Sequence, residues 1–127
     1  MNIENKPMVL VVDDEPSMRK LIRAMLESSN YQVIEADSGD EALVQCQQHQ
    51  VDIIITDLVM AGLNGIDLIL ALKQQHSLIP VIAISGGGGI NGRFDYLEIS
   101  TLIGAKSVLK KPFDKSQLLE TLQIIQA

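Results

Sequence analysis

The sequence predicts an α/β fold, in which a five-stranded parallel sheet is covered by helices on both faces. Five short apolar runs alternate along the chain with five stretches whose apolar residues recur at helical spacing. The runs are apolar at nearly every position, as in strands buried on both faces of a parallel sheet. From 127 residues, of which 46% are hydrophobic, we expect one domain over residues 1–127, with a core from about residue 8 to 126 and no output domain.

The first two strand–helix units have recognisable starts. Residues 8–12 are a continuous apolar run that predicts the first strand, and Pro16 is accepted in the first turn of the helix that follows. Residues 31–36 predict the second strand. Ser38 then precedes Glu41 at the spacing of a capping box, which predicts the start of the second helix.

The third and fourth units repeat this order. Residues 51–56 predict the third strand, and a loop containing glycine separates it from a helix whose apolar residues lie between positions 66 and 72. Residues 79–84 predict the fourth strand. Pro80 is compatible with this strand because it lies near the start, where a missing N–H is tolerated.

The last part of the chain begins with an interruption of the pattern. Glycines 86–89 predict a flexible hinge, with a phosphate-binding loop as the less favoured interpretation. Apolar residues between positions 94 and 103 predict the fourth helix, which Gly104 ends. Residues 107–109 predict a short fifth strand, and apolar residues between positions 118 and 125 predict the last helix.

The composition argues against several classes of function. The net charge of −6 disfavours binding to nucleic acid or to anionic lipid, because both need basic side chains. The single cysteine, Cys46, rules out an internal disulfide, and we interpret it as an apolar filler. No run is long enough to span a membrane and no signal pattern is present, so we expect a cytoplasmic protein. His49 and His76 are predicted to lie on the surface.

Polar residues stand at the ends of four predicted strands. In an open α/β sheet, ligands bind beyond the carboxyl ends of the strands. Each of these residues by itself would be an ordinary cap, turn or loop residue. Together they predict a functional site at one edge of the sheet. The residues are Asp13, Asp14 and Glu15 after the first strand, Asp57 after the third, Ser85 after the fourth, and Lys110 and Lys111 after the fifth.

The chemistry of this edge indicates a cation and a phosphoryl group. Clustered carboxylates repel one another unless a cation is bound, and their oxygens are suitable ligands for Mg²⁺. A carboxylate beside Mg²⁺ can act as a nucleophile toward phosphorus, which produces an aspartyl-phosphate. Phosphoryl transfer also needs neutralisation of the phosphoryl oxygens, which Mg²⁺, a lysine and a hydroxyl can supply together.

Four segments together resemble the receiver domain of response regulators in two-component signalling, and especially its single-domain chemotaxis regulators. The resemblance extends from Val9 to Ile125 and implies a flavodoxin-like (βα)5 three-layer sandwich of strand order 2-1-3-4-5. The segments are residues 11–16 (Val-Val-Asp-Asp-Glu-Pro), residues 57–60 (Asp-Leu-Val-Met) with Gly65 after them, Ser85, and residues 111–113 (Lys-Pro-Phe).

The resemblance implies a phosphoacceptor and a set of metal ligands. Asp57 would accept the phosphoryl group, with Mg²⁺ as the cofactor. Asp14 and Asp57 would bind the ion through their side chains, and the backbone carbonyl of Val59 would complete the protein ligands. Asp13 would act directly or through a metal-bound water.

The resemblance also implies two contacts to the phosphoryl group. Lys111, which directly precedes Pro112, would pair with it in preference to Lys110. The family often has a cis peptide bond at this lysine–proline step. Ser85 would donate a hydrogen bond to the phosphoryl group once it is added.

By the same resemblance, the phosphoryl group would come from a phosphohistidine on a sensor histidine kinase or a histidine phosphotransfer protein. The chain would catalyse its own phosphorylation and dephosphorylation and would not otherwise be an enzyme. A downstream protein target would bind the face formed by the fourth helix, the fifth strand and the fifth helix. Nucleic acid and membrane are not expected partners.

The sequence departs from the family pattern at several positions. Ala61 stands where the family commonly has proline, and Val108 stands where an aromatic side chain often swings inward on activation. Val59 and Gly87 have no polar side chain that could orient an attacking water. We therefore predict that the phosphorylated domain hydrolyses its own phosphoryl group slowly.

Two other functions are compatible with the same fold class. A flavin- or nucleotide-binding module could use the glycine loop, although the carboxylates would repel an anionic cofactor. An Mg²⁺-dependent phosphatase could use an aspartate nucleophile. Such enzymes usually carry a second aspartate two residues after the first, and Val59 occupies that position here.

Overall fold

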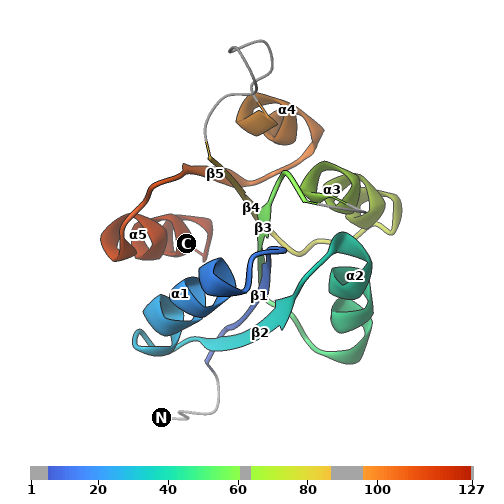
Figure 1. The fold of residues 1–127 in the computed structure, drawn as a ribbon. Coiled ribbons are helices and arrows are strands. Elements are labelled where there is room, and N and C mark those ends of the chain that lie inside the picture. Colours follow the sequence, from blue (N-terminus) through green and yellow to red (C-terminus); the bar gives the residue numbers. More distant parts are fainter. Residues whose placement is uncertain (1–5, 61–63, 87–95, 127) are drawn as a thin grey trace.

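The apolar runs form five strands of one parallel sheet, in the order β2-β1-β3-β4-β5 (Figure 1). This order confirms the predicted fold. The computed structural model describes residues 6–60, 64–86 and 96–126. The strands are β1 (Met8–Val12), β2 (Gln32–Ala36), β3 (Ile53–Asp57), β4 (Val81–Ser85) and β5 (Ser107–Lys110).

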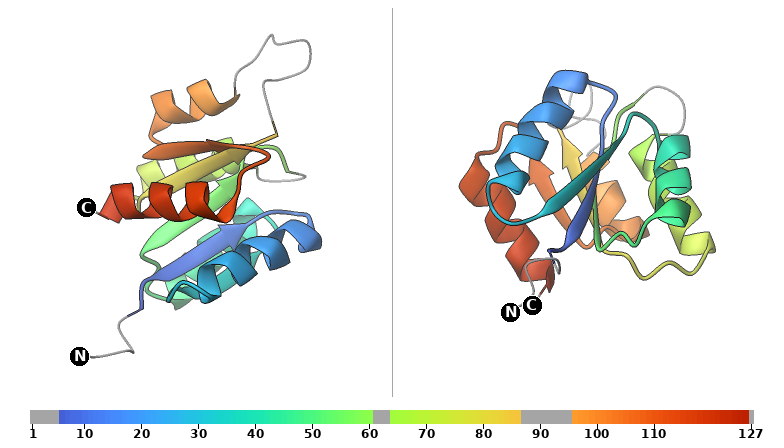
Figure 2. Two further views of the ribbon diagram at one scale, coloured as in Figure 1. Left: turned by 90° about the vertical axis from the view of Figure 1, so that its left-hand side faces the viewer. Right: turned by 90° about the horizontal axis from the view of Figure 1, so that it is seen from below.

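Five helices cover the sheet on both faces, as predicted (Figures 1 and 2). Helices α1 and α5 pack on one face, where their apolar residues form a core with alternate strand residues such as Val9 and Val11. Helices α2 and α3 pack on the other face against residues such as Leu10 and Ile54, and α4 contacts α3. The helices are α1 (Pro16–Glu27), α2 (Gly39–Gln48), α3 (Gly65–Gln74), α4 (Tyr96–Ile103) and α5 (Lys115–Gln126).

The predicted helix starts and stops agree with the local structure. Ser38 Oγ accepts a hydrogen bond from the Glu41 N–H at 3.2 Å. The Glu41 carboxylate in turn accepts from the backbone N–H of Asp37, the residue before the N-cap, at 3.1 Å. Pro16 is the first residue of α1. Gly104 follows α4 with a φ of 130°, a conformation that favours glycine.

The strand boundaries in the middle of the sheet differ from the predicted ones. β3 begins at Ile53 rather than at residue 51, and directly before it the carboxylate and the N–H of Asp52 both bond to the backbone of Met8. β4 begins after Pro80, which has no N–H to donate to the sheet. Both strands end one residue later than predicted, because Asp57 and Ser85 continue the backbone pairing although they are polar.

Several smaller predictions concern single residues away from the acidic cluster. Cys46 is partly buried and packs against the α2–α3 core, and His49 and His76 are exposed, as predicted. Val108 lies on β5 and is more than one third exposed. Ala61, glycines 87–89 and the expected start of the fourth helix at residue 94 lie outside the described residues. Within the described ranges, no helix has the length and apolar character needed to cross a membrane.

The strand register brings the polar ends together. Val12 is opposite Thr56, so the residues that follow β1 lie beside Asp57 at the end of β3. Ser85 is opposite Lys110, so the residues that follow β5 lie beside the end of β4. The carboxyl ends of β1, β3, β4 and β5 therefore supply a single edge, which contains the candidate site.

Candidate functional site

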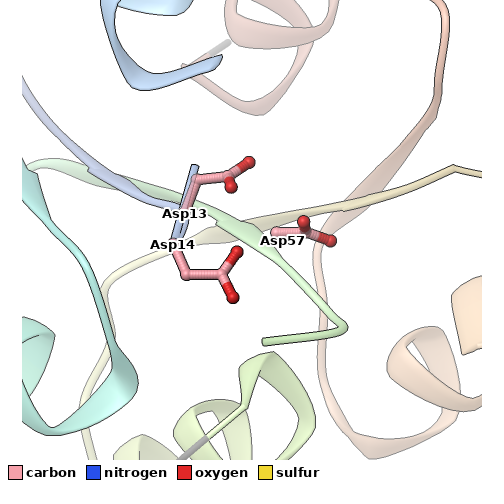
Figure 3. Close-up of side chains that lie close together, drawn as sticks. All are labelled: Asp13, Asp14 and Asp57. Carbon is pink, nitrogen blue, oxygen red and sulfur yellow. The ribbon is translucent and has the colours of Figure 1, made fainter. Parts of the chain in front are cut away.

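Three carboxylates lie together at the carboxyl ends of β1 and β3 (Figure 3). One oxygen from each of Asp13, Asp14 and Asp57 lies within 4.8 Å of the other two. Asp13 is 1% exposed and Asp57 is 7% exposed, whereas Asp14 is exposed. Two buried acids and one accessible acid therefore share a small volume that opens to solvent.

Backbone contacts fix the acidic turn after β1. The N–H of Asp13 donates to the carbonyl of Ala36 at 3.1 Å, which extends the pairing of β1 with β2 by one residue. The Asp13 carboxylate then accepts from the N–H of Glu15 at 2.9 Å. This side chain–backbone turn ends the strand and leads directly into α1, whose first residue is Pro16.

The Asp57 carboxylate is oriented by contacts to both of its oxygens. Oδ1 accepts from the N–H of Val59 at 3.3 Å, and Oδ2 lies 3.2 Å from Lys111 Nζ. The Thr56 hydroxyl, which is buried, donates to the Asp57 carbonyl at 2.9 Å. The side chain of Val59 is 57% exposed, so an apolar group lies at the solvent-facing side of this site.

Lys111 follows β5, the last strand of the sheet, and its side chain reaches the acids at the ends of β1 and β3. Its Nζ is 3.2 Å from Asp57 Oδ2 and 3.6 Å from Asp13 Oδ2. Its backbone N–H donates to the Ser85 carbonyl at 2.8 Å, which holds the turn after β5 against the end of β4. The peptide bond between Lys111 and Pro112 is cis, as the resemblance implies. Lys110 is exposed, so the structure brings Lys111 rather than Lys110 to the acids.

The electrostatics of the site suit an additional cation. Burial raises the pKa of Asp13, and the negative charges of Asp57 and Asp14 raise it further. The hydrogen bond from Glu15 and the charge of Lys111 lower this pKa, but they do not compensate in full. Three carboxylates facing one ammonium group leave excess negative charge. Oxygen donors with that charge fit a divalent cation such as Mg²⁺.

Gly65 has a structural role that the sequence analysis did not foresee. A Cβ atom at this position would lie 2.3 Å from the carbonyl oxygen of Asp57 and 2.8 Å from the Cα of Leu58. The first turn of α3 therefore packs directly on the backbone of the proposed phosphoacceptor. A glycine directly after the capping residue Asn64 was the available signal.

Arg19 is a second residue that the sequence analysis did not consider. Its Nη1 donates to the backbone carbonyl of Asp13 at 2.6 Å, and its Nε donates to the Glu35 carboxylate at 2.9 Å. The spacing of Arg19 and Arg23, one helical turn apart, was the available signal. It indicates two cations on one face of α1, but it does not identify their partners.

An apolar cavity of about 350 Å³ lies beside the site. It is open at the surface between α1 and the turn that follows β5. Its lining includes Lys111, whose Nζ contacts Asp57, so the cavity adjoins the acidic cluster. The lining residues are Met18, Leu21, Gly86, Lys111, Pro112 and Phe113.

Comparison with known sequences identifies the family of this arrangement. The sequence model of the response regulator receiver domain matches residues 9–123. The chain belongs to the response regulator receiver family. The match includes every strand, apart from Met8 at the start of β1, and the acidic cluster described above, so the predicted family is confirmed. A receiver domain explains these residues, and the flavin- or nucleotide-binding alternative is not favoured.

Individual relatives are identical to this receiver domain at about one third of the aligned residues. Protein PilH of Pseudomonas aeruginosa is 31% identical over 121 residues, which cover 94% of this chain and 97% of PilH. The transcriptional regulatory protein ResD of Bacillus subtilis is 32% identical over 119 residues, which cover 94% of this chain and 48% of ResD. The chain thus spans about half the length of several curated relatives that it matches.

Solved structures agree with the fold. The chemotaxis protein CheY4 of Vibrio cholerae superposes with a TM-score of 0.82 at 30% identity, over 94% of this chain and 98% of that chain. The receiver domain of the Francisella response regulator 1452 superposes with a TM-score of 0.83 at 28% identity, over 94% and 95% of the two chains. The receiver fold is therefore shown by both sequence and structure.

Proposed function

We propose that this receiver domain accepts a phosphoryl group on Asp57 from the phosphohistidine of a histidine kinase or a histidine phosphotransfer protein. One observation carries the proposal: the buried Asp57 carboxylate lies 3.2 Å from Lys111 Nζ and beside the carboxylates of Asp13 and Asp14. A nucleophilic carboxylate, a fixed ammonium group and a cation-binding pair of acids are the parts that phosphoryl transfer to an aspartate needs.

In the proposed reaction, a carboxylate oxygen of Asp57 attacks phosphorus. An O–P bond forms while the N–P bond to the donor imidazole breaks, and the bonding electron pair stays on the imidazole nitrogen. The contacts from Val59 N–H and Lys111 Nζ hold the carboxylate in place before the attack. After transfer, Lys111 pairs with a phosphoryl oxygen, and the Ser85 hydroxyl donates a hydrogen bond to another.

The proposed metal ligands are Asp13, Asp14, Asp57 and the backbone carbonyl of Val59. The three side chains are close enough to share one ion. When bound, Mg²⁺ neutralises charge on the carboxylates and on the phosphoryl oxygens. Asp13 and Asp57 would offer buried carboxylate oxygens to the ion, and Asp14 would offer an exposed one.

The proposed output is a change in protein–protein contacts. The phosphoryl group adds negative charge at the ends of β3 and β4, next to the turn that carries Lys111. We expect the face of α4, β5 and α5 to respond and to bind a downstream protein in the cytoplasm. We expect the domain to catalyse only its own phosphorylation and dephosphorylation. Nucleic acid and membrane are not among the proposed partners.

Mass spectrometry tests the chemistry directly. Incubation with acetyl phosphate and Mg²⁺ should add one phosphoryl group to the wild-type chain. Asp57→Asn and removal of Mg²⁺ by a chelator should each abolish the addition. Asp40→Asn is the matched control, because Asp40 is an exposed acid in the first turn of α2. Phosphorylation of Asp57→Asn to the wild-type extent would overturn the proposal.

A further inference from the structure

Arg19 connects three elements next to the acidic cluster. It lies on α1, its Nη1 donates to the carbonyl of Asp13 at 2.6 Å, and its Nε donates to Glu35 on β2 at 2.9 Å. The side chain of Arg19 is 18% exposed. A guanidinium group can donate in two directions at once from one rigid plane, so the two contacts fix each other.

Glu35 is itself held by two arginines. Its second carboxylate oxygen accepts from Arg23 Nε at 2.6 Å, and Arg23 also pairs with Glu27 at 3.0 Å. Burial raises the pKa of Glu35, but the hydrogen bonds from Arg23 and Arg19 outweigh burial and lower the pKa below its ordinary value. Glu35 is therefore a charged anchor that keeps the guanidinium group of Arg19 turned toward β2.

The contact with Asp13 acts on the backbone between the two acids. The carbonyl of Asp13 belongs to the peptide plane that joins Asp13 to Asp14, so its direction sets where Asp14 leaves the strand. The N–H of Asp13 is already bound to Ala36. With both backbone groups of Asp13 occupied, the main chain from which the two carboxylates project is held in place before any ion arrives.

We propose that Arg19, anchored by Glu35, is a positioning residue that presets the Asp13–Asp14 pair for a divalent cation. This inference rests on the proposed function, because it assumes that the acidic cluster binds Mg²⁺. Arg23 provides a matched comparison, since it lies on the same helix and pairs with the same carboxylate. Within the described residues, no hydrogen bond between Arg23 and Asp13 is present.

The sign of the effect separates positioning from simple electrostatics. Removal of a positive charge near the acids should strengthen Mg²⁺ binding if charge dominates. If Arg19 positions the acids, Arg19→Gln should weaken Mg²⁺ binding by about tenfold, as is usual when a residue that orients metal ligands is lost. Arg23→Gln leaves both hydrogen bonds of Arg19 in place, so it should change the Mg²⁺ affinity much less than Arg19→Gln does. Arg19→Lys keeps the charge but loses the planar fork, so it should bind Mg²⁺ less tightly than wild type.

The experiment is an Mg²⁺ titration of isotope-labelled wild type, Arg19→Gln, Arg19→Lys and Arg23→Gln by NMR, together with thermal unfolding of each. Phosphorylation by acetyl phosphate at saturating Mg²⁺ should recover most of the wild-type rate in Arg19→Gln, because the defect is in ion binding. If Arg19→Gln does not fold, the comparison of Arg19→Lys with Arg23→Gln decides.

Two results would overturn the inference, and they have different meanings. Equal Mg²⁺ affinity in Arg19→Gln and Arg23→Gln, or tighter binding in Arg19→Gln, would reject the positioning role while the proposed function stands. Absence of Mg²⁺ binding in folded wild type would reject the proposed function itself. A double variant of Arg19→Gln with Glu35→Gln that binds Mg²⁺ no more weakly than Arg19→Gln would support a single coupled unit.

Discussion

Two aspartates at opposite ends of β3 show how position determines the chemistry of the same side chain. Asp52 precedes the strand, is exposed, and accepts a hydrogen bond from the N–H of Met8 at 2.8 Å. Asp57 ends the strand, is buried, and shares Lys111 with another carboxylate. Asp52 is satisfied by backbone groups close to it, whereas Asp57 lies in a cluster with excess negative charge. Both edges of the sheet carry an acid, but among the described residues only at the carboxyl edge do several carboxylates share one lysine, which neutralises their charge in part.

The cavities at the two edges do not make this distinction. A cavity of about 340 Å³ lies at the amino edge, beside Asp52 and Pro80, and one of about 350 Å³ lies at the carboxyl edge, beside Lys111. Their volumes are nearly equal. The difference is that the cavity at the carboxyl edge adjoins a cluster of charged side chains that come from the ends of three strands, β1, β3 and β5. The charged side chains that meet at the carboxyl edge therefore identify the site, whereas the cavity volumes do not.

The largest expected effect is the difference between two single variants, Asp57→Asn and Asp52→Asn. Asp57→Asn should abolish phosphorylation by acetyl phosphate, because the amide cannot act as the nucleophile. Asp52→Asn should be phosphorylated like wild type, since its side chain is far from Lys111 and can still accept a hydrogen bond. Intact-mass measurement after a fixed incubation checks both. Labelling of Asp57→Asn, or loss of labelling in Asp52→Asn, would remove the contrast between the edges.

The two neighbouring lysines sharpen the same comparison. Lys111→Met should slow phosphorylation by about 100-fold, because an ammonium group that stabilises the transferring phosphoryl oxygens is lost. Lys110→Met should have little effect, because Lys110 is exposed. Successive side chains of an extended chain point to opposite sides, so the Lys110 side chain is directed away from that of Lys111. Initial rates with acetyl phosphate measure both variants. Similar rates in the two variants would show that Lys111 does not act on the phosphoryl group.

Glycine positions at the carboxyl edge should differ in their effect on stability. Gly65→Ala should destabilise the domain by about 1–3 kcal/mol, because the new methyl group collides with the backbone of Asp57 and Leu58. Gly86→Ala should be tolerated, because a Cβ atom there meets nothing within 4 Å. Urea unfolding of the two variants tests this difference, and equal midpoints would contradict the close contact.

The smallest expected effect is the pH dependence of Asp13→Asn. The raised pKa of Asp13 means that the folded protein binds this proton more tightly than the unfolded chain does. Stability from this group is therefore present at low pH and is lost as the pH rises from about 3.9 through the raised value. Without metal, Asp13→Asn should be more stable than wild type at pH 7, and the gain should shrink as the pH falls.

Urea unfolding at several pH values, with a chelator present, measures this gain. Added Mg²⁺ should reverse the order, because it stabilises the wild-type site by mass action and binds the variant less well. Asp52→Asn serves as the control at the other edge. A variant that is less stable than wild type at neutral pH without metal would contradict the cause given for the pKa of Asp13.

The sequence predicted the sheet well because its signals are local and repeated. Apolar runs, Pro16, the Ser38–Glu41 pair and Gly104 each act within a few residues. The sequence pattern predicts the ends of β3 and β4 one residue too early, because it excludes the polar residues Asp57 and Ser85. Backbone pairing continues through them, and a pattern of apolar side chains does not report backbone pairing.

The set of candidate site residues was also predictable in large part. Parallel strands bring their carboxyl ends to one edge, so the order of elements was enough to group Asp13, Asp57 and Lys111. The contacts of Arg19 and Gly65 were not predictable in this way. One depends on the angle between α1 and β2, and the other on how closely α3 approaches β3, and both follow from packing of the complete domain.

The position of β5 at one side of the sheet has a consequence for self-association. An edge strand exposes backbone groups that a second copy could pair with, and charged side chains there discourage such pairing. Lys106 directly precedes β5, Lys110 is its last residue, and both are exposed. The segment that supplies Lys111 to the acids therefore also carries charges that oppose sheet-to-sheet aggregation. Neutralising Lys106 and Lys110 would affect the solubility of the protein before it affected its chemistry.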